Sequence, residues 1–145
     1  MAPVPSSVGY SGTPLPQKLG LKDGQRVLFI DLPEDLESLR SSCDFAEVAA
    51  AGWSSLPAAM SYDLVHAFTS SRAIFEKAAG PLMETIARNG SIWISWPKKA
   101  SKVATDITED VIREIVLPIG LVDVKVAAVN DVWSGLKLVI RKELR

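Results

Sequence analysis

Cysteine and histidine are almost absent from this chain of 145 residues, which contains one of each, Cys43 and His66. A single cysteine excludes an internal disulfide, and one cysteine with one histidine is too small a set for the usual zinc sites. A mechanism that needs two histidines is excluded as well. We therefore predict no metal site, and we assign no catalytic residue.

Excess charge and long apolar runs are lacking too. The net charge is -1, so no general attraction to nucleic acid or to anionic lipid is expected. The longest apolar run, around residues 115–122, contains Pro118 and Gly120 and is too short to span a membrane. Residues 1–7 lack the basic start and apolar stretch of a signal peptide. These absences predict a cytoplasmic protein that binds neither nucleic acid nor membranes.

The residues that are present predict one globular domain behind a short arm. The apolar fraction is 48% and the charged fraction 23%, which are ordinary values for a domain of this length. Residues 1–17 contain four prolines and several small polar residues, and we expect an extended, partly disordered arm there. Tyr10 and Leu15 could dock that arm on the body. Residues 18–145 should form the domain.

The centre of the domain is predicted to lie at residues 91–97. Ile92, Trp93, Ile94 and Trp96 are all β-branched or aromatic, which is typical of a strand buried on both faces inside a parallel sheet. Pro97 cannot donate to a ladder, so the strand should end there. Ligands of open α/β sheets bind at this carboxyl end of the strands.

Alternating or continuous apolar runs predict further strands near residues 26–31, 45–50, 62–68, 122–126 and 136–140. Helices are predicted at 33–41, from Ser70 to Asn89-Gly90 with a kink or restart at Pro81, and from Asp106 to Pro118. Shorter helical turns are expected at 17–21 and at 57–60. This order predicts an α/β fold with a mainly parallel sheet and helices on both faces. The connection 130–135 is too short for a crossover, so the last two strands should form an antiparallel hairpin.

Four blocks of the chain resemble a small bacterial protein family of unknown function. They are Tyr10 to Leu15 with Lys18 to Gly20, Trp93 to Lys99, Thr105 to Arg113, and Gly120 to Val126 with Trp133 to Leu138. The likeness extends over nearly the whole chain and implies a fold and a cellular setting, but no mechanism. The chain is also similar in its order of elements to the second half of Rossmann-like methyltransferases. That likeness implies a single Rossmann-like three-layer domain with strand order 2-1-3-4-6-5.

One feature departs from those enzymes. They place a glycine-rich turn after the first strand, where the cofactor approaches the backbone, and residues 30–35 contain no glycine. A dinucleotide fingerprint and a phosphate-binding P-loop are absent from the sequence as well. The sequence alone therefore indicates no bound cofactor.

A basic loop follows the central strand, at Lys98 and Lys99. If the strands that end at Phe68 and Trp96 are neighbours, this loop lies beside the first turn of the helix that begins at Ser70. Free N–H groups of that turn favour an anion, Ser71 adds a hydroxyl, and Arg72 could make a bidentate contact. The plainer interpretation is a solvated loop, because runs of charge usually are.

Four further side chains belong to the predicted site or lie beside it. Trp96 could form an apolar wall for a base or an acyl group. Asp31, at the end of the first strand, could accept from a ligand hydroxyl or cap the following helix. Ser95 and His66 are more simply structural, since a lone inward histidine usually just finds a hydrogen bond.

These observations favour a non-catalytic, Rossmann-like module that binds a small anionic ligand or a protein partner. One alternative is a divergent transferase that uses S-adenosylmethionine, and this rests on the likeness of fold alone. Another is a structural subunit that forms a homo-oligomer through the edge of the C-terminal hairpin, near residues 122–129.

Overall fold

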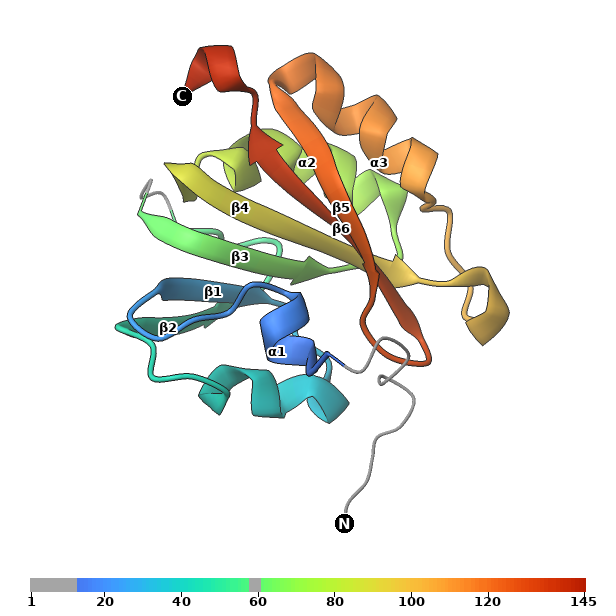
Figure 1. The fold of residues 1–145 in the computed structure, drawn as a ribbon. Coiled ribbons are helices and arrows are strands. Elements are labelled where there is room, and N and C mark those ends of the chain that lie inside the picture. The colour runs from blue at the N-terminus through green and yellow to red at the C-terminus, as the bar shows by residue number, and fades with distance from the viewer. Residues whose placement is uncertain (1–12, 58–60) are drawn as a thin grey trace.

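A twisted six-stranded sheet runs through the middle of the molecule (Figure 1). The computed structural model describes residues 13–57 and 61–145. Its strands are β1 (Arg26–Ile30), β2 (Glu47–Ala51), β3 (Tyr62–Phe68), β4 (Ile86–Pro97), β5 (Leu121–Ala128) and β6 (Trp133–Ile140). Its α-helices are α1 (Leu15–Lys18), α2 (Arg72–Met83) and α3 (Glu109–Val116). The 3-10 helices are η2 (Glu34–Ser41), η3 (Lys99–Ser101), η4 (Leu117–Ile119) and η5 (Lys142–Leu144).

The sheet order is β2-β1-β3-β4-β6-β5, as predicted. β1, β2, β3 and β4 pair in parallel, and β6 is antiparallel to both β4 and β5. The hairpin therefore folds back so that its second strand, β6, lies against β4. This confirms the α/β class, the single mainly parallel sheet and its antiparallel end.

Helices cover both faces of the sheet, which gives three layers (Figure 1). On one face, α2 and α3 bury a cluster that includes Val65, Ile94 and Leu138. On the other face, α1 and η2 cover a second cluster around Phe29, Phe68 and Trp93. Successive side chains of a strand point to opposite faces, so β3 and β4 supply both clusters. No helix within the described residues is long and apolar enough to cross a membrane.

The predicted end of α2 is wrong. The helix stops at Met83, two residues after Pro81, and β4 already begins at Ile86. Gly90 was expected to cap the helix with a positive φ, but it lies inside β4, and its φ is not positive. A Cβ at Gly90 would come within 2.9 Å of the Tyr62 carbonyl oxygen. The glycine is therefore needed for close approach of two strands.

The predicted start of α3 is also wrong. Thr108 is the N-cap, and its hydroxyl accepts from the Val111 N–H at 3.2 Å. Asp106 instead accepts from the backbone N–H of Arg72 at 2.7 Å and thus caps α2, a helix 34 residues away in sequence.

Other boundaries move by a few residues. The second strand occupies 47–51, the first helical turn 15–18, and the hairpin strands extend to 121–128 and 133–140. The segment at 34–41 is a 3-10 helix. The predicted turn at 57–60 falls mostly outside the described residues, as do Tyr10 and the rest of 1–12. Leu15 packs partly against the second core cluster.

Candidate functional site

Two of the predicted loops meet at the carboxyl edge of the sheet. β3 and β4 are neighbours, and the ladder between them continues to a bond from the Thr69 N–H to the Ser95 carbonyl at 3.1 Å. The loop after β4 returns to the start of α2, where the Thr105 hydroxyl donates to the Ser70 carbonyl at 2.8 Å. The residues that follow β3 and β4 therefore share one edge, as the sequence suggested.

The first turn of α2 is already supplied with acceptors. Ser71 is the N-cap, and its hydroxyl accepts from the Ile74 N–H at 3.2 Å. The backbone N–H of Arg72 is held by the Asp106 carboxylate. The Arg72 guanidinium pairs with Glu114 at 3.1 Å and with Glu76 at 3.5 Å. An external anion at this turn would have to share these groups with the protein's own acids.

Trp96, Lys98 and Lys99 differ in how deeply they are buried. Trp96 is 7% exposed and belongs to the core cluster beneath α2 and α3. Lys98 is half-buried, and its N–H donates to the Val132 carbonyl at 2.7 Å. Lys99 is exposed in η3, on a loop that projects from the body (Figure 1). No ion pair engages Lys98, Lys99 or Lys102 within the part of the chain that the structure describes.

Asp31 lines a pocket of about 710 Å³ that includes none of the other predicted site residues. The pocket is lined by Asp31, Gly52, Trp53, Ser54, Leu56, Ile74, Lys77, Ala78 and Pro81. Asp31 has a φ of 53°, a left-handed conformation that costs most residues about 1–2 kcal/mol and aspartate less. Its backbone N–H donates to the Ala51 carbonyl at 3.1 Å, so β2 helps to hold this conformation. A strained residue beside a pocket is a feature of binding sites.

Trp53 forms part of that pocket, a role the sequence did not indicate. Its indole N–H donates to the Phe68 carbonyl at 2.8 Å, and its ring meets Phe75 edge-on with centroids 6.3 Å apart. These contacts anchor the connection after β2 over the sheet. Gly52 and Trp53 directly follow a strand at the carboxyl edge, and a firmer prediction of β2 would have shown them to be candidates.

His66 and Ser95 form a buried pair. The His66 Nε2 and the Ser95 Oγ are 2.7 Å apart, and the two residues are 1% and 0% exposed. Burial lowers the pKa of the His66 imidazole to about 3. A Cβ at Gly135 would lie 3.1 Å from Ser95 Oγ, so the hydroxyl is closely packed. The pair has the chemistry of a nucleophile and a base but no access for a substrate.

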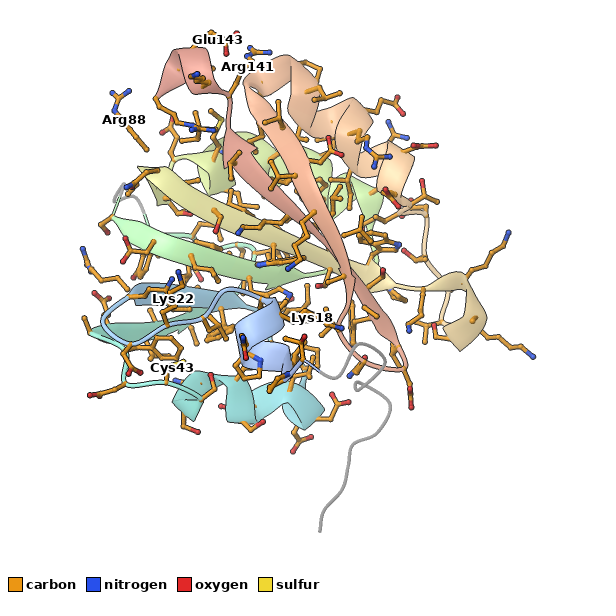
Figure 2. All side chains as sticks on the ribbon, viewed as in Figure 1. Lys18, Lys22, Cys43, Arg88, Arg141 and Glu143 are labelled. Carbon is orange, nitrogen blue, oxygen red and sulfur yellow. The ribbon has the colours of Figure 1, made fainter. Side chains whose placement is uncertain are left out.

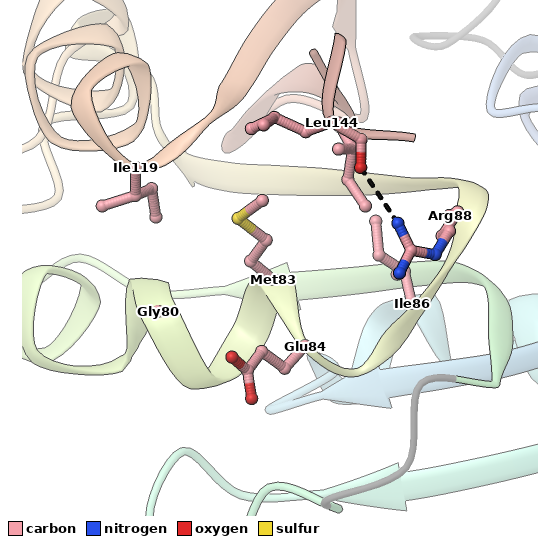
Figure 3. Close-up of a pocket in the computed structure, with 8 residues that line it drawn as sticks. Gly80, Met83, Glu84, Ile86, Arg88, Ile119 and Leu144 are labelled. Atoms are coloured by element: carbon pink, nitrogen blue, oxygen red, sulfur yellow. Dashed lines mark hydrogen bonds between the residues drawn. The ribbon is translucent and has the colours of Figure 1, made fainter. Parts of the chain in front are cut away.

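Another pocket lies at the C-terminal end of α2, away from the carboxyl edge of the sheet. Its volume is about 370 Å³, and apolar side chains such as Met83 and Ile119 face it (Figure 3). The Arg88 guanidinium spans one side, donating to the Leu144 carbonyl at 3.2 Å (Figure 3). These contacts tie the C-terminal η5 to the start of β4.

Known proteins share this fold but little of the sequence. No protein-family model and no curated protein matches the chain. A S-adenosylmethionine-dependent methyltransferase from Aquifex aeolicus superposes with a TM-score of 0.62 at 15% identity, over 86% of each chain. The N-methyltransferase NodS from Bradyrhizobium japonicum gives 0.59 at 13% identity, over 86% of this chain and 90% of that one. Magnesium protoporphyrin IX methyltransferase from Synechocystis, solved with bound S-adenosylhomocysteine, gives 0.58 at 12% identity, over 83% and 75%.

The chain thus has a Rossmann-like, methyltransferase-like α/β fold. At these levels of identity the similarity establishes the fold alone.

Proposed function

We propose that the chain is a divergent S-adenosylmethionine-dependent transferase that binds this cofactor in the pocket beside Asp31. The observation that carries the proposal is the left-handed Asp31 at the carboxyl end of β1, in the lining of a pocket. Its volume of about 710 Å³ is within the range of ligand pockets. The likeness of fold adds support.

The side chains in the pocket suit the chemistry of this cofactor. An exposed carboxylate such as Asp31 accepts from ribose hydroxyls and favours the positive charge of a sulfonium ion. Lys77 lies in the same pocket and could pair with the cofactor's carboxylate, while Leu56 and Ile74 offer apolar surface for the adenine ring. The cofactor supplies an activated methyl group when bound.

The missing glycine turn weighs less against this cofactor than against a nucleotide. A bound phosphate needs free backbone N–H groups and is repelled by acidic side chains. After the first strand, Pro33 removes one N–H, and Glu34 and Asp35 add negative charge. S-adenosylmethionine carries no phosphate and has a net positive charge, so these acids do not repel it. The same residues that exclude a dinucleotide are therefore compatible with a sulfonium ligand.

Calorimetric titration with S-adenosylmethionine and S-adenosylhomocysteine tests the proposal. We expect binding to the wild type, and we expect Asp31→Asn to weaken it about tenfold or more, because a hydrogen bond to a charged group is lost. Asparagine tolerates the left-handed conformation, so the backbone should be retained. Asp44→Asn, an exposed aspartate outside the pocket, is the matched control.

Two results would end the proposal: no heat at millimolar cofactor, or unchanged affinity in Asp31→Asn. Transfer of a labelled methyl group to amine, hydroxyl and carboxyl acceptors then tests catalysis. Binding without any transfer would leave a binding module in place of an enzyme.

A second candidate function, non-catalytic binding of a small anion or a protein at the basic loop, is favoured by the unpaired charges of Lys98 and Lys99. Changing both to alanine should abolish binding of any anion found by thermal shift with nucleotides, coenzyme A, sugar phosphates and phosphate. Stability should hardly change, since exposed surface substitutions usually shift it by about 0.5 kcal/mol or less. A double variant that binds normally would remove the loop from consideration.

A further inference from the structure

A polar pocket of about 470 Å³ lies at the amino-terminal edge of the parallel strands, opposite the edge that holds Asp31. Its polar side chains come from the loop before β1, the start of β3, the first half of β4 and the middle of β6. They include Lys22, Asp23, Asp63, Asn89, Ser91 and Lys137. Figure 2 shows Lys22 on the loop between α1 and β1.

Lys137 has an unusual environment in this pocket. It is half-buried on β6, on the face opposite Leu136 and Leu138. In the sheet register it lies directly across from Lys125 on β5. Burial lowers the pKa of the Lys137 ammonium, and the charges of Lys125 and Lys22 lower it further. No hydrogen bond or ion pair to Lys137 is found among residues 13–57 and 61–145.

This arrangement of lysines is unfavourable in the absence of a counter-charge. Like charges directly opposite each other destabilise a sheet, and a partly desolvated ammonium costs more than an exposed one. Lys125 donates to the Lys18 carbonyl at 3.1 Å, and that main-chain oxygen carries no formal charge. The charges of Lys125 and Lys22 thus act on Lys137, and no ion pair within the described residues offsets them.

The two acids in the pocket, Asp23 and Asp63, bind backbone N–H groups. The Asp63 carboxylate accepts from the Arg26 N–H at 2.9 Å, and the Asp23 carboxylate from the Asp44 N–H at 2.7 Å. One oxygen of each carboxylate is thus committed to a backbone N–H, and neither acid forms an ion pair with Lys137. Ser91 and Asn89 retain free side-chain donors within the described part of the chain.

We propose that this pocket binds a small, multiply charged anion of the phosphate class, with Lys137 as the central contact and Lys22 beside it. An anion there would place negative charge beside Lys22 and Lys137, and hydroxyl and amide donors from β4 could complete its coordination. The site lies at the opposite edge of the sheet from the proposed cofactor pocket and does not depend on it.

Titration with inorganic pyrophosphate at constant ionic strength tests this site. We expect one equivalent to bind the wild type and to raise its melting temperature. Lys137→Gln should weaken binding about tenfold or more, while its melting temperature without ligand stays equal or rises because the repulsion is relieved. Lys142→Gln, an exposed lysine in η5, is the matched control and should bind as the wild type does. Inorganic phosphate and a sugar monophosphate in parallel distinguish a free anion from a phosphorylated metabolite.

The proposal is overturned if the wild type shows no saturable binding, if Lys137→Gln binds pyrophosphate unchanged, or if Lys142→Gln loses as much affinity. Should Lys137→Gln not fold, Lys22→Gln tests the same pocket, because Lys22 is exposed and its replacement leaves the sheet intact.

Discussion

His66 shows how strongly one residue can link the stability of this fold to pH. Its ring stacks on Phe68 with centroids 4.2 Å apart, and its buried Nδ1 has no hydrogen-bond partner among the described residues. The interior therefore accepts the neutral imidazole and rejects the charged one. In the unfolded chain the same ring takes up a proton near pH 6.5.

We predict that the protein loses stability as the pH falls below 6.5. The folded-state pKa is about 3, so between pH 3 and pH 6.5 the unfolded chain binds more protons than the folded one. The contribution of His66 to stability is therefore complete above pH 6.5 and is lost as the pH falls toward 3. From pH 7 to 5 the loss should be about 2 kcal/mol. Urea unfolding at both pH values measures it. In His66→Gln the decrease should be smaller by that amount, whatever the variant's stability at pH 7. An equal decrease in both proteins would contradict the assignment.

Side-chain positions within strands could be predicted from the sequence, whereas backbone conformations and loop contacts could not. Alternation along a strand predicts that His66 shares a face with Leu64 and Phe68, and the three do lie on one face of β3. Nothing in the sequence indicated that Asp31 adopts a positive φ, because its N–H bonds to a strand 20 residues away. The contact of Asp106 with Arg72 likewise depends on where two loops meet in the folded chain.

At the scale of elements, strands were easier to predict than helix ends. β3 was predicted at its observed bounds because its apolar run is bordered by polar residues on both sides. The boundary between α2 and β4 was misplaced because Ile86 continues the helical spacing of Ala78 and Leu82, yet it belongs to the strand. Its pairing with Tyr62 in the sheet decided the outcome. Tertiary pairing thus overrode local periodicity.

The acid that caps α2 occupies part of the predicted anion site. Asp106 lies where the sequence predicted an external anion at the start of α2. A carboxylate from the chain is the same kind of ligand that such a turn attracts. The sequence therefore predicted the right chemistry for this turn without showing that the protein supplies the acceptor itself.

For the whole molecule, the sheet order was predictable and the pockets were not. Short connections, right-handed crossovers and the hairpin limit the possible orders of strands to a few, and the order 2-1-3-4-6-5 is confirmed. The pocket beside Asp31 forms between the connection after β2 and one face of α2, which are far apart in sequence. Four of its nine lining residues lie in 52–56, a segment for which the sequence predicted neither a helix nor a strand.

β5 forms the outer edge of the sheet, and it is where we expect the molecule to self-associate. It pairs with β6 on one side, and no other strand of the described residues pairs with it. Val124 and Val126 on this strand are 55% and 48% exposed. An edge strand of eight residues with exposed valines is a template for pairing with a second copy. Its two charged side chains are engaged within the chain: Asp123 is bound to Arg113 at 2.9 Å, and Lys125 donates to the Lys18 carbonyl.

We predict a reversible dimer in which β5 of one copy pairs with β5 of the other. Sedimentation velocity over a wide range of concentration should show a species of twice the 15.7 kDa chain mass. Val126→Lys should shift the protein to monomer, because lysine on an edge strand opposes pairing. Val103→Lys is the matched control: Val103 is 47% exposed but lies in the loop after η3, away from β5. Monomer at every concentration would exclude the dimer. Equal dissociation of both variants would show that the added charge acts regardless of its position, and would exclude β5 as the interface.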